Sequence, residues 1–277
     1  QPPQKSQRGQ KINKSPIQGI SETLKIEYRT PISLKNNKEE YDYLKKLDAD
    51  IAIVVAYGQI IPKEYLGLVK KGFINIHASL LPKWRGAAPI QRSIMNLEKE
   101  TGVSIMRIGE KLDTGPVCNS YKIEIMSDDN SETITEKLST LAAEKILDNI
   151  DEILEDKIEF KEQNHNKASY ATKIEKTEGQ IEWGETAENI IGKINGLYPS
   201  PGAFFIYNGE RYKILKASLS LGSGKIGEVL DNYLEVSCGN KKSIKVLEIQ
   251  RQGKRPQNIS EFMLGSQIKK GSNLSNA

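Results

Sequence analysis

Hydrophobic residues in the first 160 positions alternate between two kinds of spacing. Short apolar runs predict strands at 25–28, 51–56, 73–77, 103–108 and 117–125. Helical spacing of apolar residues predicts helices near 17–24, 38–47, 62–71, 89–98 and 133–153. The run 51–56 is apolar on both faces, which is typical of a strand in a parallel sheet covered by helices on both sides. The alternation of strands and helices predicts an α/β domain with a mostly parallel sheet.

Two details of this domain can be predicted more closely. Pro89 is expected near the first turn of its helix, where a missing N–H costs nothing. Thr133 and Glu136 have the spacing of a capping box, so the long helix after them is expected to begin at Thr133.

The spacing changes in the last third of the chain. A predicted helix at 186–195 is followed by short β-like runs separated by Asn-Gly, Asp-Asn and Gly-Asn turns. These runs lie at 203–207, 211–219, 226–230, 233–238 and 243–249. About five short strands favour a small barrel of the OB type, a common nucleic-acid platform. We therefore expect an α/β domain at 1–160, a polar linker at 161–184 and the barrel domain at 185–277.

Composition narrows the class of protein. With 37% hydrophobic and 27% charged residues, and no apolar run near the roughly 18 needed to cross a membrane, no membrane partner is expected. The two cysteines, Cys118 and Cys238, lack a CxxC partner, which argues against a zinc site and favours a reducing cytoplasm. Residues 1–20 carry a net charge of +4 and residues 240–277 carry +6, so the middle carries −6 within the total of +4. Basic ends around an acidic middle suggest contact with a polyanion, or alternatively two solvated tails.

One strand brings together side chains that can carry chemistry. Alternation along 73–77 places Asn75 and His77 on the same face. Asp113 follows 36 residues after His77, in a Leu-Asp-Thr-Gly turn. A carboxamide, an imidazole and a carboxylate can together polarise a carbonyl group and move a proton. The structural alternatives are a hydrogen-bonded strand histidine, a strand-end cap and an Asx-turn residue.

The same residues carry a family resemblance. Asn-x-His followed by Ser79, Leu80, Leu81 and Pro82, together with the Asp113 turn, resembles the folate-dependent formyltransferases. The run from Trp84 to Gln91 is most similar to the branch of that family that acts on methionyl-tRNA. The resemblance implies a Rossmann-like catalytic domain, an OB-like tRNA-binding domain, and 10-formyltetrahydrofolate as co-substrate with no metal. It also implies that Asn75, His77 and Asp113 are catalytic and that Ser79 to Pro82 line the folate site.

The resemblance assigns the basic ends as well. Arg8, Lys11 and Lys14 would contact tRNA, as a similar segment of the family does, and Lys254 and Arg255 would follow phosphates in a salt-dependent way. The family normally begins with a strand, a helix and a second strand that have no counterpart here, so we expect an exposed edge in the sheet. Trp84 and Arg85 could contact substrate or pack internally, and the sequence leaves both roles open.

The implied activity is transfer of a formyl group from the folate to the α-amine of methionyl initiator tRNA, by a cytoplasmic monomer. Two alternatives would share the catalytic trio: a formyltransferase acting on a nucleotide-linked amino sugar, and a hydrolase releasing formate from formyltetrahydrofolate. A third is a non-catalytic RNA-binding fragment. Salt-sensitive tRNA binding, sugar-nucleotide binding and formate release without an acceptor would separate them.

Overall fold

The computed structural model describes residues 1–6 and 11–275. It divides into two compact units, each made of several chain segments. The first contains Gln1–His77, Ile105–Cys118 and Asn149–Glu162; the second contains Ala78–Ser104, Asn119–Asp148 and Gln163–Ala277.

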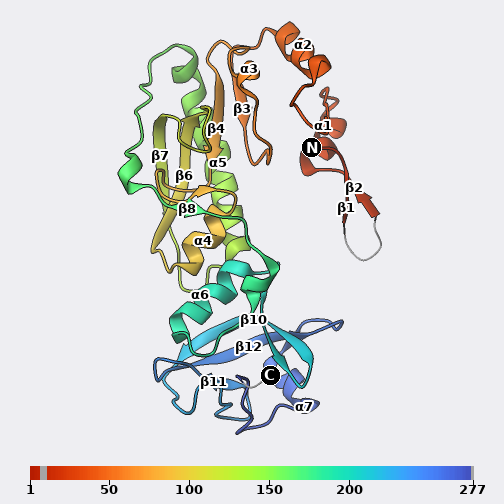
Figure 1. Cartoon of the computed structure of the whole chain (residues 1–277), viewed down its shortest axis with the longest axis vertical. Coiled ribbons are helices and arrows are strands. Elements are labelled where there is room, and N and C mark those ends of the chain that lie inside the picture. The colour runs from red at the N-terminus through yellow and green to blue at the C-terminus, as the bar shows by residue number, and fades with distance from the viewer. Residues whose placement is uncertain (7–10, 276–277) are drawn as a thin grey trace. The chain divides into compact units, whose positions relative to one another are not determined.

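The expected α/β sheet has four strands in the order β3-β4-β6-β7 (Figure 1). The strands are β3 (Ala52–Val54), β4 (Phe73–His77), β6 (Glu100–Arg107) and β7 (Val117–Glu124). β3 and β4 are parallel, with Ala52 opposite Phe73. Two further short strands, β1 (Gln4–Ser6) and β2 (Lys11–Asn13), form a separate antiparallel ribbon.

The predicted helices are present in this part of the chain. They are α1 (Pro16–Leu24), α2 (Lys38–Leu47), α3 (Lys63–Leu66), α4 (Pro89–Met95) and α5 (Ser131–Leu154). The capping box predicted at Thr133 is wrong. The side chain of Asn130 accepts hydrogen bonds from the backbone N–H groups of Glu132 (2.9 Å) and Thr133 (3.0 Å), so α5 begins earlier. Across the described residues, none of these helices is both long enough and apolar enough to cross a membrane.

Two predictions about strands fail, one for a local reason and one for a tertiary reason. Residues 25–28 form no strand, because Lys25 has a φ of 57° at the end of α1 and Ile26 donates its N–H back to Ser21. β3 is not covered on both faces: Ile53 is 39% exposed and the following Val55 is 58% exposed. β3 lies at the end of the strand order of this sheet.

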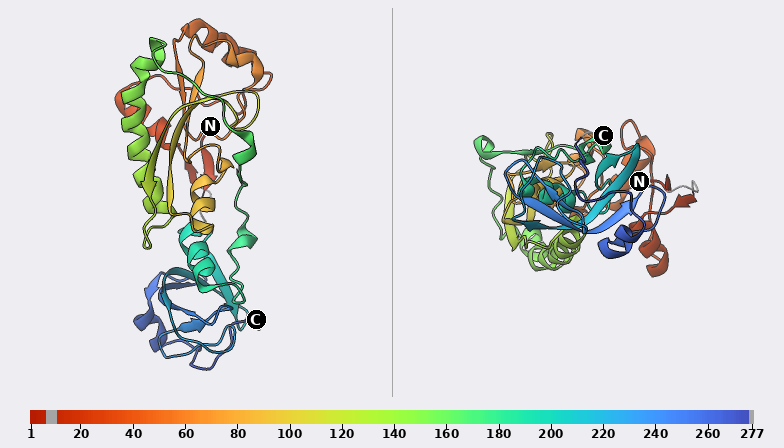
Figure 2. Two further views of the ribbon diagram at one scale, coloured as in Figure 1. Left: turned by 90° about the vertical axis from the view of Figure 1, so that its left-hand side faces the viewer. Right: turned by 90° about the horizontal axis from the view of Figure 1, so that it is seen from below.

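The C-terminal strands form a curled antiparallel half-barrel, which confirms the expected small barrel (Figure 2). Its strands are β9 (Ala203–Tyr207), β10 (Glu210–Ser220), β11 (Glu235–Ser237), β12 (Ser243–Arg251) and β13 (Gln257–Asn258). The register of β10 on β12 shifts around Lys216, and such bulges bend a strand and help a sheet to curl. Residues 226–230, predicted as a strand, form only the isolated bridges of Glu228 and Val229.

Aromatic and branched side chains fill the half-barrel. Phe205 stacks on Tyr212 with ring centroids 5.4 Å apart, and Trp183 meets Phe205 edge to face. Helix α6 (Ala187–Leu197) buries Ile190 and Ile194 in this core. Helix α7 (Ile259–Leu264) adds Phe262.

The segment expected as a linker has ordered contacts inside the second unit. It contains the 3₁₀ turns His165–Lys167 and Lys176–Gly179, with β8 (Tyr170–Ala171) between them. β8 pairs in parallel with β5 (Arg85–Gly86). The segment is therefore not a free connector, and the domain boundaries at 160 and 185 stay a prediction.

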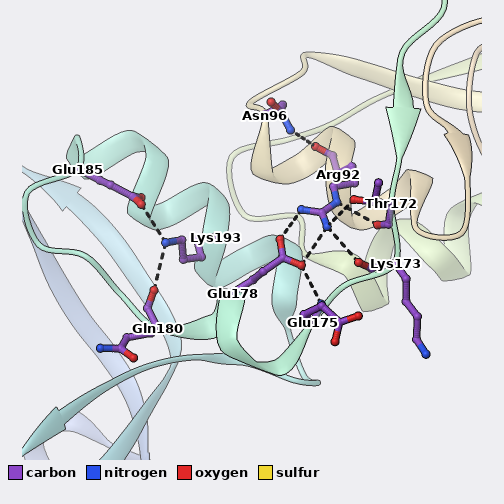
Figure 3. Close-up of polar contacts among 9 residues, drawn as sticks. All are labelled: Arg92, Asn96, Thr172, Lys173, Glu175, Glu178, Gln180, Glu185 and Lys193. Atoms are coloured by element: carbon purple, nitrogen blue, oxygen red, sulfur yellow. Dashed lines mark hydrogen bonds and ion pairs between the residues drawn. The ribbon is translucent and has the colours of Figure 1, made fainter.

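Arg92 on α4 fixes the second half of this segment (Figure 3). Its guanidinium donates to the carbonyl groups of Thr172 (3.1 Å) and Lys173 (3.2 Å) and to both carboxylate oxygens of Glu178 (2.6 and 3.0 Å). Glu178 also accepts the backbone N–H of Glu175 at 2.7 Å. The hydrogen bonds from Arg92 lower the pKa of Glu178 below its ordinary value of 4.5.

The Glu178 pair predicts a pH-dependent stability difference. Because the folded-state pKa is lowered, the ionised carboxylate stabilises the fold above about pH 4.5, and this contribution is lost as pH falls through the lowered value. We expect Glu178→Gln to lower the free energy of unfolding by roughly 1–2 kcal/mol at pH 7 and by much less in acid. Urea unfolding across pH measures this, with Glu182→Gln, an exposed carboxyl on the same segment, as control. An equal difference at all pH values would contradict the assignment.

Candidate active site

Strand β4 presents Asn75 and His77 on one face by simple alternation. Ile74 and Ile76 on the other face are 0% and 7% exposed, so that face is filled by apolar side chains and the polar pair lies on the opposite one. His77 is buried at 6% exposure, and Asn75 is half-buried. The predicted strand and its alternation are confirmed.

Asp113 reaches His77 from the turn between β6 and β7. One carboxylate oxygen (Oδ2) lies 3.7 Å from Nδ1 of His77, and the two side chains are 12% and 7% exposed. This is ion-pair distance, longer than an ordinary hydrogen bond. Catalytic hydrogen bonds are often long without substrate and shorten when it binds. The turn therefore places a carboxylate beside the imidazole, as the sequence predicted.

The Asp113 turn is held by backbone packing as well as hydrogen bonds. Asp113 itself has a φ of 50°, in the left-handed region that Asp tolerates better than most residues. The hydroxyl of Thr114 donates to the carbonyl of Lys111 at 3.1 Å. Gly115 lies so close to β6 that a Cβ there would be 1.9 Å from the carbonyl oxygen of Arg107. The position of Asp113 therefore depends on a glycine two residues later.

Asn75 differs from its neighbours in its hydrogen bonding. Its backbone pairs with β3, opposite Val54. Its carboxamide makes no hydrogen bond with any residue that the structure describes. A half-buried amide with unused donors on the face that carries His77 can donate to a ligand oxygen. The catalytic role of Asn75, His77 and Asp113 stays a prediction, and their placement is compatible with it.

The loop after His77 is shaped by hydrogen bonds that the sequence did not reveal. Ser79 is 0% exposed, and its hydroxyl donates to the carbonyl of Lys83 at 2.6 Å. The hydroxyl of Ser104, on β6, donates to the carbonyl of Ser79 (2.8 Å) and accepts the N–H of Leu81 (3.0 Å). The Leu81–Pro82 bond is cis. The only sequence signal for Ser104 was a hydroxyl inside an apolar strand.

The remaining loop residues are more accessible than Ser79. Leu80, Leu81 and Pro82 are partly exposed. The Ser79 hydroxyl already donates to the carbonyl of Lys83. Ser79 can therefore affect a ligand through the backbone conformation of the loop. Within the described residues, no cluster of three or more His, Cys, Asp or Glu side chains could hold a metal ion.

The predicted tRNA-binding residues have different environments. Arg8 lies outside the described residues, and the backbone of Lys11 belongs to β2. Lys14 pairs with Glu22 at 2.7 Å, and the hydrogen bond from Lys14 holds the pKa of Glu22 at about 2.

The two C-terminal basic residues are both exposed, but only one is paired. Arg255 pairs with Glu261 at 2.9 Å. No carboxylate of the described residues lies within ion-pair distance of Lys254. Lys254 and Arg255 belong to the second unit, and Lys14 belongs to the first.

Comparison with known proteins adds sequence and fold relationships. The family model for formyl transferase matches residues 1–150, and the model for the formyl transferase C-terminal domain matches residues 173–267. The chain is 72% identical over 276 residues to methionyl-tRNA formyltransferase of Pelagibacter ubique, covering 100% of this chain and 89% of that protein. It is 40% identical over 274 residues to the same enzyme of Jannaschia sp., covering 99% and 89%.

Solved structures show the same fold at lower sequence identity. A crystal structure of WlaRD, a sugar 3N-formyl transferase in the presence of dTDP and 5-N-formyl-THF, superposes with a TM-score of 0.63 at 23% identity. The match covers 76% of this chain and 77% of that chain. At this identity the likeness establishes the fold alone, and it confirms the expected Rossmann-like arrangement.

The packing of Gly115 predicts how the Asp113 turn can be disturbed. In Gly115→Ala the new methyl group would overlap the carbonyl oxygen of Arg107, so the turn must move away from β6. We expect the free energy of unfolding to fall by about 1–3 kcal/mol. Gly109→Ala is the matched control, because its Cβ would meet no atom closer than 3.9 Å. Equal unfolding midpoints for both variants in urea would show that the close approach does not constrain the turn.

Proposed function

The chain belongs to the formyltransferase family, and on this basis we infer that it transfers a formyl group from 10-formyltetrahydrofolate to the α-amine of methionyl initiator tRNA. The observation that carries this function is 72% identity to a methionyl-tRNA formyltransferase along the whole chain. Formylation of the initiator aminoacyl-tRNA supports translation initiation. The activity is measured directly by incubating charged initiator tRNA, the folate donor and this chain.

Asn75, His77 and Asp113 form the proposed catalytic group. The neutral α-amine attacks the formyl carbon, a new C–N bond forms, and a tetrahedral oxyanion develops. The unbonded carboxamide of Asn75 supports a role as donor to that oxyanion, with His77 as the second stabilising group. Asp113, 3.7 Å from His77, orients the imidazole and takes the amine proton directly or through water. Collapse of the intermediate breaks the bond to the folate nitrogen, which leaves with the electron pair and gains a proton.

The two substrates are proposed to bind different segments. The loop Ser79–Pro82 directly follows His77 in the chain and would contact the folate through its backbone and its partly exposed side chains. Arg8, Lys11 and Lys14 at one end and Lys254 and Arg255 at the other would contact tRNA phosphates. We further propose that the protein acts as a monomer in the cytoplasm without a membrane partner.

The alternative activities have weaker support. Sugar N-formyltransferases share the fold at 23% identity, whereas the methionyl-tRNA enzymes match nearly the whole chain at 40–72%. A folate hydrolase would need no basic surface for an acceptor. A non-catalytic RNA-binding fragment would have no need for Asp113 beside the buried His77. Both residues lie in the same unit as Asn75.

Replacing His77 tests the catalytic assignment. We expect His77→Ala to lower kcat for formyl transfer by about a hundredfold or more, because a group that stabilises the transition state is lost. The affinity for initiator tRNA, measured by filter binding, should stay close to that of the parent protein. Turnover at the parent rate in a folded His77→Ala variant would remove His77 from the mechanism.

Replacing Lys254 tests the proposed phosphate contact. Because no described carboxylate pairs with Lys254, its charge is available to a polyanion, and Lys254→Ala should reduce the salt slope of tRNA binding by about one. Lys122→Ala is a matched control, since that lysine already pairs with Glu100 at 3.1 Å. An unchanged slope for Lys254→Ala would place the tRNA elsewhere on the protein.

A further inference from the structure

Arg85 is a buried charge that the proposed chemistry does not use. It lies in the loop after His77 and is only 2% exposed. A guanidinium is costly to bury unless its charge and its N–H groups are satisfied. No carboxylate among the described residues lies within ion-pair distance of it. The sequence left open whether Arg85 contacts substrate or packs internally, and its burial is evidence for an internal role.

The partners of Arg85 are the side chains of two residues about 80 positions later in the chain. Its Nε and Nη2 atoms donate to the side-chain oxygen of Gln163 at 3.1 and 2.7 Å. Nη2 also lies 3.0 Å from Nδ1 of His165, which accepts in the neutral tautomer. The planar guanidinium reaches both acceptors at once, and the single ammonium group of a lysine cannot reproduce that fork.

Backbone contacts extend this connection along the loop. The N–H of Arg85 donates to the carbonyl of Ser169 at 2.9 Å. The N–H of Trp84 donates to the Ser169 hydroxyl at 2.9 Å, and the N–H of Ser169 donates to the carbonyl of Pro82 at 3.4 Å. Residues 163–171 therefore lie directly against the loop proposed to bind folate.

The backbones of β5 and β8 pack closely at Gly86. A Cβ at Gly86 would lie 2.7 Å from the carbonyl oxygen of Ala171, its partner in β8. The loop is thus held at one end by the covalent link to His77 and at the other by Arg85 and β8. Loss of the Arg85 contacts would weaken the hold on the second of these ends, and Ser104 would remain as the support for Ser79 and Leu81.

We propose that Arg85 is a positioning residue for formyl transfer. Through Gln163 and His165 it holds residues 163–171 against the loop, and so fixes the backbone that receives the folate donor. This inference rests on the proposed function. Arg85 is not proposed to contact substrate, because its guanidinium already contacts Gln163 and His165.

The experiment compares Arg85→Lys, Gln163→Leu and Gln163→Glu in the full chain. Arg85→Lys keeps the charge and loses the fork, whereas Gln163→Leu removes an acceptor at similar volume. Gln163→Glu keeps the acceptor and adds a charge that complements Arg85. Arg29→Lys is the matched control, since Arg29 pairs with Glu39 and Glu40, all three in the first unit, whereas the loop belongs to the second.

Five quantities are measured for each variant. They are the unfolding midpoint, the Kd for 5-formyltetrahydrofolate as an unreactive analogue, the Kd for initiator tRNA, and the separate kcat and KM values for formyl transfer. In Arg85→Lys and Gln163→Leu we expect the folate Kd and KM to rise about tenfold, as for loss of a hydrogen bond to a charged group. The tRNA Kd should be unchanged. Gln163→Glu and Arg29→Lys should stay within about threefold of the parent.

Three outcomes would overturn the proposal. Parent-like folate affinity in both folded variants, Arg85→Lys and Gln163→Leu, would mean that the connection does not position the loop. A loss confined to Arg85→Lys would show that Arg85 contacts the substrate itself. Equal loss in Gln163→Glu and Gln163→Leu would reflect general damage to packing. If the parent protein binds the folate analogue but does not formylate methionyl-tRNA, the proposed function fails while the folate Kd still tests Arg85.

Discussion

The register of β4 is the constraint on which the candidate site depends. Ile74 and Ile76 are almost fully buried, and the side chains between and after them belong to Asn75 and His77. A shift of one residue would exchange the two faces and place the isoleucines where the carboxamide and the imidazole now lie. Parallel pairing with β3, which sets Val54 opposite Asn75, further fixes this register. The positions of the two isoleucines thus determine the face on which Asn75 and His77 lie.

A second requirement is that Asp113 reaches the imidazole from a separate part of the chain. The turn achieves this with a left-handed Asp and a glycine pressed against β6. Backbone geometry therefore determines the 3.7 Å separation between Oδ2 of Asp113 and Nδ1 of His77. The proposed catalysis requires groups that are held in place before the reaction begins. The carboxamide of Asn75, which makes no hydrogen bond with a described residue, adds a donor on the same strand.

Two arginines connect the loop and helix after His77 to the segment that precedes the half-barrel, and they do so in different ways. Arg92 binds a carboxylate with two hydrogen bonds and also two backbone carbonyl groups. Arg85, more deeply buried, contacts the side chains of Gln163 and His165 and has no carboxylate partner among the described residues. A bidentate ion pair adds charge attraction, whereas the planar fork of Arg85 sets the geometry of the two side chains that it meets. The segment expected as a linker is consequently part of the architecture of this unit.

The sequence by itself determined the local elements and the chemistry they carry. Periodicity located β4, α2, α5 and most strands of the half-barrel, and the motif around Asn75, His77 and Asp113 identified the family. These features depend on neighbours within a few residues, so a linear pattern records them. Tertiary structure alone decided the exposure of β3 and the partners of Arg85. Those outcomes depend on which distant segment lies against each residue, and for Arg85 that segment is 78 positions away.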